Sequence, residues 1–512
     1  MPKTAKVRLH LFTDPDFKIT VPTRRQTVVS GGNATYRVES DGLGTYVDDT
    51  DLDVTGLPEG VDFSFAIDPI GYDASTNLTI NTTQLSVGTH NFSIDAEIYT
   101  PPQDAIYADS PSLADVQAAI AAASPGQTVI VPAGSATWNS QLIITKGIRL
   151  IGAGSNLTHI TAGFGTIHDY PIEYSPSSPA LDEPFRLSGF DFDFNHTGTG
   201  LFLYVAQGYI LHNIRIDHNA FRHATLNLIK FRGPVYGVAD NNYFHMDLDQ
   251  QAGDCAGHNQ WNWLNENAEF GTANNFYFED NVFDVYQQLA AGGQGNRYCF
   301  RYNTVNNSQS NIYMQVWDAH GSYWYGSDEN SLFSPMVIEI YDNIIHGTRT
   351  PELFGHRGGM AVCYNNLVDA SSSTCYIHVR NEYASFNTIN PINSPNGEPK
   401  YVHKTYYWGN RDGSKIIPAE TTESWYYPDL GRNVPVDNLD YWNEVASFDG
   451  SSGVGVGLLS ARPLSCTLEG VGYWATDQNR LYRWHNGAWE VFYTPYTYPH
   501  PLRTLLNDTA NK

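Results

Sequence analysis

The segments IRIDHNAF (residues 214–221), GVADNNYF (237–244), FYFEDNVF (276–283) and IEIYDNII (338–345) repeat one pattern, in which an Asn follows an apolar residue by three positions. The residues at this phase along the chain are Asn195, Asn219, Asn242, Asn281, Asn303, Asn343, Asn366 and Asn387. Successive members are 21 to 24 residues apart, except for two longer intervals of 39 and 40 residues. The basic period is therefore about 22 residues.

A repeat of this length, made of short β-rich segments, is typical of one turn of a parallel β-solenoid. Each coil buries its inward face against the neighbouring coils, so the apolar residues before the Asn should point inward. Those expected inside are Phe192, Ile216, Phe278, Phe300 and Ile340. An Asn at a constant turn can adopt left-handed backbone geometry and bond its neighbours. We therefore expect the eight Asn side chains to stack in one ladder.

A single helix is predicted before the repeat, in the segment SPSLADVQAAIAAASPG. Ser112 and Asp115 form a capping-box pattern, and small and apolar residues follow at helical spacing. The helix should end near Ser124, because Pro125 and Gly126 break it. We expect it to plug the open end of the solenoid and cover an exposed sheet edge.

The segments GQTVIVPAG (126–134) and KGIRLIGAG (146–154) follow this helix directly. In this order, helix and segments resemble the right-handed parallel β-helix superfamily, which includes pectate-lyase-like proteins and phage tailspikes. The resemblance covers residues 108–410. It implies a mainly β protein whose residues 104–412 form a helix-capped right-handed parallel β-helix. Fold alone does not specify activity.

Two further parts flank the repeat. Residues 1–103 alternate apolar and polar side chains between turn residues, which predicts a small β-sandwich. Residues 18–100 resemble immunoglobulin-like modules of bacterial surface proteins and phage structural proteins. Residues 413–512 form an aromatic-rich β tail, in which YWATDQNRLYRWHNGAW (473–489) resembles hairpin modules of phage tail fibres.

The charge and cysteine content of the chain limit the kinds of ligand and partner that it can bind. The 512 residues include 29 Lys and Arg against 54 Asp and Glu, a net charge of -25, which disfavours nucleic acid and anionic membranes. Five cysteines without a C-x-x-C pair argue against a disulfide framework or a zinc site. The first residues lack an apolar export segment, so we expect a protein made without the general export route or one whose leader is absent.

The two long intervals predict loop insertions at about residues 246–273 and 306–334. Both leave the coil after the Asn turn and lie two coils apart, so their roots should be on the order of 10 Å apart. Aromatic faces stack well on pyranose rings, which suggests a sugar groove between the insertions. Its candidate walls are Trp261, Trp263, Trp317, Tyr323, Trp324 and Tyr325. The alternative is that these side chains form small cores beneath the loops.

Candidate catalytic residues lie in or beside the same insertions, because glycoside hydrolysis needs two carboxylates across the scissile bond. The candidates are Glu266, Asp318, His320, Arg297 and Arg357. A basic set that could form a stripe comprises Lys230, Arg232, Arg297, His356, Arg357, His378 and Arg380. The alternative is that the acids are ordinary loop residues and that the bases pair within the chain. Lyases of the similar superfamily use Arg or Lys near acidic sugars, often with Ca²⁺, so Ca²⁺ is a possible cofactor by resemblance only.

We therefore expect a virion-associated, tailspike-like or tail-fibre-like protein that recognises a cell-surface polysaccharide through a groove on the β-helix. The resemblance also implies a homo-oligomer, by preference a trimer, together with other virion proteins as partners and a virion or extracellular location. Two alternatives stay open. One is a secreted polysaccharide lyase or glycoside hydrolase, and the other is a structural decoration protein without a ligand.

Overall fold

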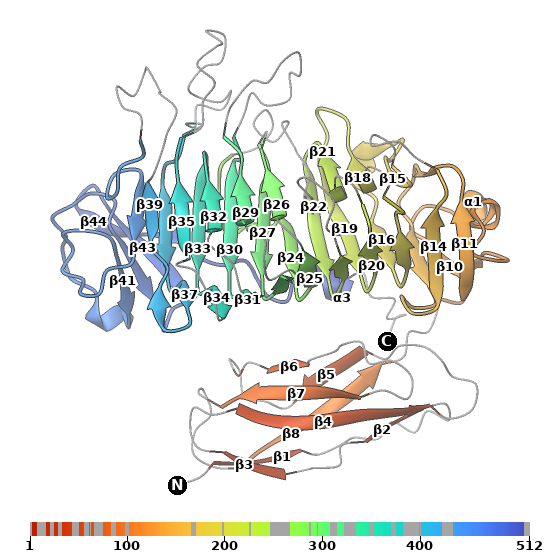
Figure 1. Ribbon diagram of the computed structural model, residues 1–512, viewed down its shortest axis with the longest axis horizontal. Coiled ribbons are helices and arrows are strands. Elements are labelled where there is room, and N and C mark those ends of the chain that lie inside the picture. Colours follow the sequence, from red (N-terminus) through yellow and green to blue (C-terminus); the bar gives the residue numbers. More distant parts are fainter. Residues whose placement is uncertain are drawn as a thin grey trace. The chain divides into compact units, whose positions relative to one another are not determined.

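Figure 1 shows the computed structural model of the protein, which forms two compact units, Met1–Gln103 and Asp104–Asn507. The structure describes residues 3–7, 17–20, 25–28, 33–42, 51–55, 61, 63–65, 75–82, 89–97, 102–164, 170–196, 199–224, 227–245, 267–285, 288–293, 295–307, 315–321, 334–347, 352–369, 375–381, 399, 401–421 and 434–505.

The first unit contains two four-stranded sheets, ordered β3-β1-β8-β5 and β2-β4-β7-β6. Their strands are β1 (Lys3–Val7), β2 (Phe17–Thr20), β3 (Arg25–Val28), β4 (Asn33–Gly42), β5 (Asp51–Thr55), β6 (Phe63–Phe65), β7 (Ser75–Asn81) and β8 (Thr89–Glu97). Strand β4 pairs antiparallel with β7 and buries Ala34, Tyr36 and Val38 at alternate positions. This period of two places one side of the strand in a core and leaves the other outside.

The second unit contains a stack of coils whose strands lie on three faces. The first face contains β9 (Ile106–Tyr107), β10 (Thr128–Val131), β13 (Arg149–Gly152), β16 (Phe185–Ser188), β19 (Leu211–Asp217), β22 (Val235–Asp240), β24 (Phe276–Glu279), β27 (Arg297–Arg301), β30 (Val337–Tyr341), β33 (Met360–Tyr364), β36 (Thr405–Trp408) and β40 (Tyr441–Asn443). The second face contains β11 (Gly134–Trp138), β14 (Thr158–Ala162), β17 (Asp191–Asp193), β20 (Ala220–Arg222), β23 (Tyr243–His245), β25 (Val282–Val285), β28 (Thr304–Asn307), β31 (Ile344–His346), β34 (Leu367–Asp369), β37 (Arg411–Asp412) and β38 (Lys415–Ile416).

The third face consists of two sheets. One contains β12 (Leu142–Ile144), β15 (Ile172–Tyr174), β18 (Thr199–Tyr204) and β21 (Asn227–Arg232). The other contains β26 (Gln288–Gly292), β29 (Gln315–Ala319), β32 (Glu352–His356), β35 (Tyr376–Val379) and β39 (Ala419–Thr421). Both lie along the upper side of the solenoid in Figure 1. Neighbouring strands of the stacked coils are parallel, for example Arg186 with Arg215 and Asp318 with Gly355, whereas β38 pairs antiparallel with β37 at the end of the second face. The second unit is therefore a parallel β-helix, as the 22-residue period predicts.

The inside of this solenoid is one continuous apolar core. The five residues expected inside, Phe192, Ile216, Phe278, Phe300 and Ile340, are all buried in it. Phe278 and Phe300 occupy paired positions on β24 and β27, and their ring centroids stack 4.4 Å apart. Each coil thus shares its core with the next, which is how a solenoid buries surface that one coil alone cannot cover.

A ladder of buried Asn side chains runs beside the core. The side-chain Nδ2 of each member donates to the Oδ1 of the next at 2.9–3.1 Å. The members are Asn219, Asn242, Asn281, Asn303, Asn343, Asn366 and Asn410. The left-handed backbone conformation belongs to the residue before each Asn, such as Asn241 with φ 53° or Gly409 with φ 67°.

The ladder differs from the predicted one at both ends. Asn195 is exposed and donates to the carbonyl of Ala162 rather than to another Asn. Its coil instead places Phe190 at the ladder position, where the Phe190 N–H donates to Asn219 Oδ1 at 3.1 Å. Asn387 lies outside the described residues. Asn410 continues the ladder, 44 residues after Asn366.

The predicted helix is α1 (Leu113–Ala122), and Figure 1 places it at the N-terminal end of the solenoid. The Asp115 N–H donates to the Ser112 hydroxyl at 3.2 Å, so Ser112 caps the first turn. Val116, Ala119 and Ile120 are buried and join the core at this end. The apolar side chains of the helix are therefore part of the solenoid core.

The C-terminal residues fold against the first face. They form a four-stranded sheet of β41 (Val454–Gly457), β42 (Gly472–Ala475), β43 (Arg480–His485) and β44 (Ala488–Tyr493), followed by α3 (Leu502–Leu505). Trp474 and Tyr493 pack on Tyr364 of β33, which stacks on Trp408 of β36 at 4.3 Å. The aromatic residues of the tail thus cover their own solenoid.

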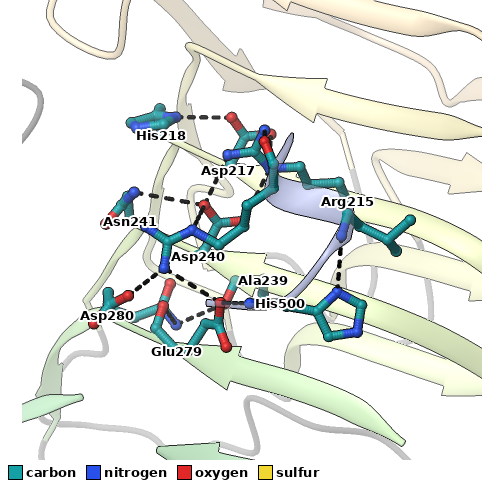
Figure 2. Close-up of polar contacts among 12 residues, drawn as sticks. Arg215, Asp217, His218, Ala239, Asp240, Asn241, Glu279, Asp280 and His500 are labelled. Atoms are coloured by element: carbon teal, nitrogen blue, oxygen red, sulfur yellow. Dashed lines mark hydrogen bonds and ion pairs between the residues drawn. The ribbon is translucent and has the colours of Figure 1, made fainter. Parts of the chain in front are cut away.

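Residues 493–505, which we call the C-terminal strap, cross five strands of the first face in reverse order. One side chain from each of these strands binds the strap. These side chains are Glu339 on β30, Arg301 on β27, Glu279 on β24, Asp240 on β22 and Arg215 on β19. Figure 2 shows the last part of this contact, where Glu279, Asp280 and Asp240 gather around the end of the strap. Among the described residues, no helix is long and apolar enough to cross a membrane.

Candidate functional site

The outer surface of the third face carries a group of connected polar side chains centred on Asp318. Asp318 lies in β29, where its neighbours Trp317 and Ala319 point into the core. Side chains alternate along a strand, so Asp318 points to the outside. Its partners on the next two strands are Gly355 in β32 and His378 in β35. Asp318, Gly355 and His378 therefore lie in one outward-facing row across three consecutive coils.

Arg357 forms a bidentate pair with Asp318. Its Nε lies 2.9 Å from Asp318 Oδ1, and its Nη2 contacts Oδ2. His320 also approaches, with its Nε2 3.2 Å from Oδ2. Burial acts to raise the pKa of the Asp318 carboxyl, but Arg357 and then His320 outweigh it and hold the pKa below its ordinary value. Asp318 is therefore an ionised carboxylate at neutral pH.

A second carboxylate, that of Glu352, is linked to Asp318 through one amide. The Nε2 of Gln315 donates to Asp318 Oδ1 at 3.2 Å and to Glu352 Oε1 at 2.9 Å. These two carboxylate oxygens are therefore at most about 6 Å apart. His378 Nδ1 lies 3.6 Å from the same Glu352 oxygen.

Gly355 provides the space that this arrangement needs. A Cβ atom at this position would lie 1.8 Å from Gln315 Nε2 and 2.6 Å from Glu352 Oε1. Both distances are far below van der Waals contact, so any side chain would displace the bridging amide. A residue without a side chain is thus required between the two acids.

We call this group the Asp318 cluster. Its members are Gln315, Asp318, His320, Glu352, Arg357 and His378. It combines two carboxylates, two imidazoles, a guanidinium and an amide, with the side chain of His320 29% exposed. Such a set can accept and donate hydrogen bonds to a polar ligand and can also transfer protons.

The structure brings together three of the five predicted catalytic residues, Asp318, His320 and Arg357. Arg297 is in a different place, on β27 of the first face. Its guanidinium binds the carbonyl oxygens of Asn267 and Glu269, the latter at 2.8 Å, and packs over the Tyr236 ring. This corrects the expectation that Arg297 shares a groove with Asp318, because here it fixes a backbone segment.

Trp317 also differs from its predicted position. It has no exposed surface and lies in the core, with its ring centroid 6.1 Å from that of Phe300. It belongs to β29 rather than to a loop, and the strand alternation turns it inward while Asp318 turns outward. This corrects the expectation that Trp317 stacks on a sugar.

The other predicted site residues lie outside the described part of the chain. They are Glu266, Trp261, Trp263, Tyr323, Trp324 and Tyr325. Their roles stay predictions. Within the described ranges, no group of three or more His, Cys, Asp or Glu side chains could hold a metal ion.

The predicted basic stripe is divided between faces. Lys230 and Arg232 in β21 and His378 in β35 belong to the third face, whereas Arg297 is on the first. His356 is buried, with its Nδ1 2.7 Å from the Tyr407 hydroxyl, and burial lowers its pKa to about 3. It is therefore a neutral structural residue.

Sequence reasoning missed Gln315, Glu352 and Gly355. Gln315 and Glu352 lie 37 positions apart, and only the pairing of β29 with β32 brings them together. The one available signal was the segment PELFGHRGG, in which Glu352 and Gly355 stand shortly before Arg357. Recognising it would have required the strand register.

No family model matches the chain, and no curated protein matches it. Among solved structures, it is similar to "Geobacillus virus E2 - ORF18", with 14% identity, a TM-score of 0.32 and coverage of 62% of each chain. It thus spans 62% of the length of that protein. It is also similar to a pectin methylesterase from carrot, with 11% identity, a TM-score of 0.31 and coverage of 64% of this chain and 90% of that one. An alginate lyase from Paenibacillus sp. str. FPU-7 gives 14% identity, a TM-score of 0.34 and coverage of 55% and 98%. Similarity at this level assigns no function, so the assignment rests on the site itself.

Proposed function

We propose that this protein recognises a cell-surface polysaccharide on the outer surface of the third face, as a virion-associated, tailspike-like protein. The observation that carries the proposal is the Asp318 cluster, in which six polar side chains from three successive coils are linked on one outward surface. Sugar hydroxyl groups both donate and accept hydrogen bonds, and carboxylates beside an amide and a guanidinium supply both partners. The segments that precede β24 and follow β29 hold the predicted aromatic residues Trp261, Trp263, Tyr323, Trp324 and Tyr325, which would add stacking surfaces.

The test is a binding screen against a panel of purified bacterial surface polysaccharides, with the wild type, Asp318→Asn and Arg357→Lys. We expect one polysaccharide to bind the wild type and to bind both variants at least about tenfold more weakly, as for loss of a central polar anchor. Arg480→Gln is the matched control, because Arg480 is exposed on β43 and far from the third face in the fold. Binding that is insensitive to Asp318 and Arg357 would refute the site, and the absence of any binding would favour a structural decoration role.

A second candidate function is cleavage of the bound glycan. It is favoured by the separation of at most about 6 Å between oxygens of Asp318 and Glu352. Retaining glycosidases place their two carboxyl groups about 5–5.5 Å apart, whereas inverting enzymes place them about 6.5–9.5 Å apart. The pair therefore suits a retaining hydrolase better than an inverting one.

Analysis of the products released from the polysaccharide distinguishes binding alone from cleavage. New reducing ends released by the wild type would indicate a hydrolase, and absorbance of an unsaturated uronate would indicate a lyase. In an enzyme, Glu352→Gln and Asp318→Asn should abolish turnover while some binding survives. If the wild type binds the polysaccharide without releasing product, the protein is a receptor-binding protein only.

We also propose that the chain forms a homo-oligomer, by preference a trimer. The support is a set of exposed aliphatic residues on the second face. Ile344 on β31 and Leu367 on β34 are paired neighbours, and Val282 on β25 and Ile416 on β38 lie beyond Thr304 and Arg411 in the same register. Exposed apolar surface often marks an interface. Light scattering of the wild type should give a multiple of the 57.0 kDa chain mass, and Ile344→Lys with Leu367→Lys should reduce it. A monomeric wild type at micromolar concentration would refute the proposal.

We also propose a structural family for the N-terminal unit and for the C-terminal hairpin. We propose that Met1–Gln103 is an immunoglobulin-like module, supported by its two four-stranded sheets and by the alternate burial in β4. We propose that residues 473–489 are a tail-fibre-like hairpin, supported by the antiparallel pairing of β43 with β44. An experimental structure of each part would test these assignments through its strand order.

A further inference from the structure

A second group of polar and aromatic residues lies on the third face, on the N-terminal side of the Asp318 cluster. We call it the aromatic–basic patch, and it consists of Tyr170, Phe202, Tyr204, Lys230 and Arg232. Phe202 and Tyr204 come from β18, and Lys230 and Arg232 occupy the paired positions on β21. Phe231, between the two bases, lies in the core, so both bases point outward.

The rings of the patch form a stacked layer. Tyr170 stacks on Phe202 with ring centroids 4.4 Å apart at 16°, and Phe202 stacks on Tyr204 at 6.0 Å and 22°. Phe202 is buried, whereas Tyr170 and Tyr204 keep part of their surface exposed. The layer therefore presents flat aromatic surface that is fixed in place before any ligand arrives.

The two cations are held at the rings. Lys230 Nζ lies 3.4 Å from the Tyr170 hydroxyl and 5.5 Å from its ring centroid. The Arg232 guanidinium lies 5.7 Å from the Tyr204 ring centroid and is exposed. The nearest acid in the register is Glu173, paired with Phe202 and hydrogen-bonded by the Gln141 amide at 2.9 Å. The patch therefore places two cations beside one carboxylate, on a chain whose net charge is -25.

We infer that the aromatic–basic patch is a second glycan subsite, which takes a sugar unit carrying a carboxylate. The apolar face of the pyranose ring packs on Tyr204 or Tyr170, and its carboxylate pairs with the Arg232 fork and the Lys230 ammonium. An acidic chain repels anionic polymers at long range, so a local pair of cations is what allows an acidic sugar to bind here. This inference rests on the proposed function, because it names the chemical class of the polysaccharide.

The position of the patch allows one glycan chain to reach both sites. Strand β21 and strand β29 are three coils apart on the same face, which corresponds to about 14 Å at about 4.8 Å per strand. Figure 1 shows both sheets of the third face on the same side of the solenoid. A polysaccharide that lies along the solenoid axis would therefore contact the aromatic–basic patch and the Asp318 cluster together, which links two modest sites into one stronger one.

Affinity electrophoresis in native gels that contain alginate, an acidic uronate polymer, or dextran, a neutral polymer, tests the inference. We expect alginate but not dextran to slow the wild type, and the effect to weaken as salt is added. Lys230→Gln with Arg232→Gln, and separately Tyr204→Leu, should each weaken the alginate affinity at least about tenfold. The matched control is Lys415→Gln with Arg480→Gln, which removes two exposed cations from other surfaces and should behave like the wild type.

Thermal melts of all variants establish that they are folded. The inference is overturned if alginate does not slow the wild type, if dextran slows it equally, or if the Lys230 and Arg232 changes leave the alginate affinity unaltered. Failure of the proposed function gives a different result. In that case alginate binding depends on Lys230 and Arg232, while Asp318→Asn leaves the affinity for every surface polysaccharide unchanged. That result would support the aromatic–basic patch and refute the assignment of the Asp318 cluster.

Discussion

Arg503 Nη1 lies 3.2 Å from Glu279 Oε1, although the two residues are 224 positions apart in the chain. The same guanidinium contacts Asp280 and lies 3.4 Å from Asp240 through its Nε. Asp240 and Glu279 have no exposed surface. The strap therefore supplies a cation to acids that the first face has removed from water, and burial without such a partner is costly.

Arg503→Ala should lower the free energy of unfolding by about 1–3 kcal/mol, because the buried carboxylates of Asp240 and Glu279 each lose one hydrogen-bonding cation while Arg215 and Arg301 remain paired with them. Chemical denaturation followed by fluorescence measures the change. Arg480→Ala is the control and should cost less than about 0.5 kcal/mol, as exposed substitutions usually do. A loss at Arg503 no larger than the control would show that the strap is not held by charge.

Asn303→Ala tests the ladder. The Asn303 amide donates to the carbonyls of Phe278 and Arg301 and to Asn343 Oδ1, and it accepts from Asn281. Its removal leaves buried polar groups without partners, at a cost of about 1–3 kcal/mol for each such group. Asn195→Gly offers a comparison, since Asn195 is exposed, outside the ladder and has a φ of 47°, which glycine adopts without strain, and the change should cost less than about 1 kcal/mol. Equal effects at the two sites would contradict a stabilising ladder.

Phe278→Ala tests the core between two coils. The ring is fully buried and stacks on Phe300. Truncation should cost about 3–5 kcal/mol through lost transfer energy and the cavity that remains. The same denaturation measurement applies, and a cost below about 1 kcal/mol would mean that the coils close around the gap.

Gly355→Ala tests the geometry of the Asp318 cluster. The added methyl group must displace the Gln315 amide or the Glu352 carboxylate, so glycan affinity should fall at least about tenfold. The melting temperature should change little in comparison, because both of these side chains face outward. If affinity for the glycan identified in the binding screen is unchanged, the bridge between the two acids plays no part in recognition.

Stability should fall as the pH is lowered from about 7 toward 4. Burial lowers the pKa of His500 to about 4 and that of His356 to about 3, against an ordinary value of 6.5. The unfolded chain therefore binds protons on these residues at pH values where the folded chain does not, which favours unfolding as pH decreases through this window. His356→Gln should flatten the pH dependence of the urea midpoint between pH 6.5 and 4. A midpoint of this variant that follows the wild type at every pH would contradict this account.

The fold could be predicted from the sequence because the ladder requires one Asn in each coil, and this requirement leaves a visible period. The prediction was wrong at Asn195, because the alternating segment FDFDF forms β17 on the second face and Phe190 holds the ladder position. Asn410 was missed because a 44-residue interval interrupts the period.

The site was harder to predict, because its members meet only through strand register. Asp318, His320 and Arg357 could be selected as chemically suitable residues, but their contact depends on the pairing of β29 with β32. Trp317 shows most clearly why the sequence alone does not determine the site. A shift of one residue decides which side of a strand a side chain occupies, and the sequence VWDAH is compatible with either choice.

The C-terminal strap changes how the solenoid should unfold. In a stack of coils, each coil contacts only its neighbours, so the ends can fray independently and unfolding can proceed coil by coil. A single segment bound to β30, β27, β24, β22 and β19 spans five consecutive coils and so links coils that are not neighbours in the stack. None of these coils can open without releasing the strap from the others. The central part of the protein should therefore melt as one cooperative block, with a sharper transition than its nearest-neighbour contacts alone would produce.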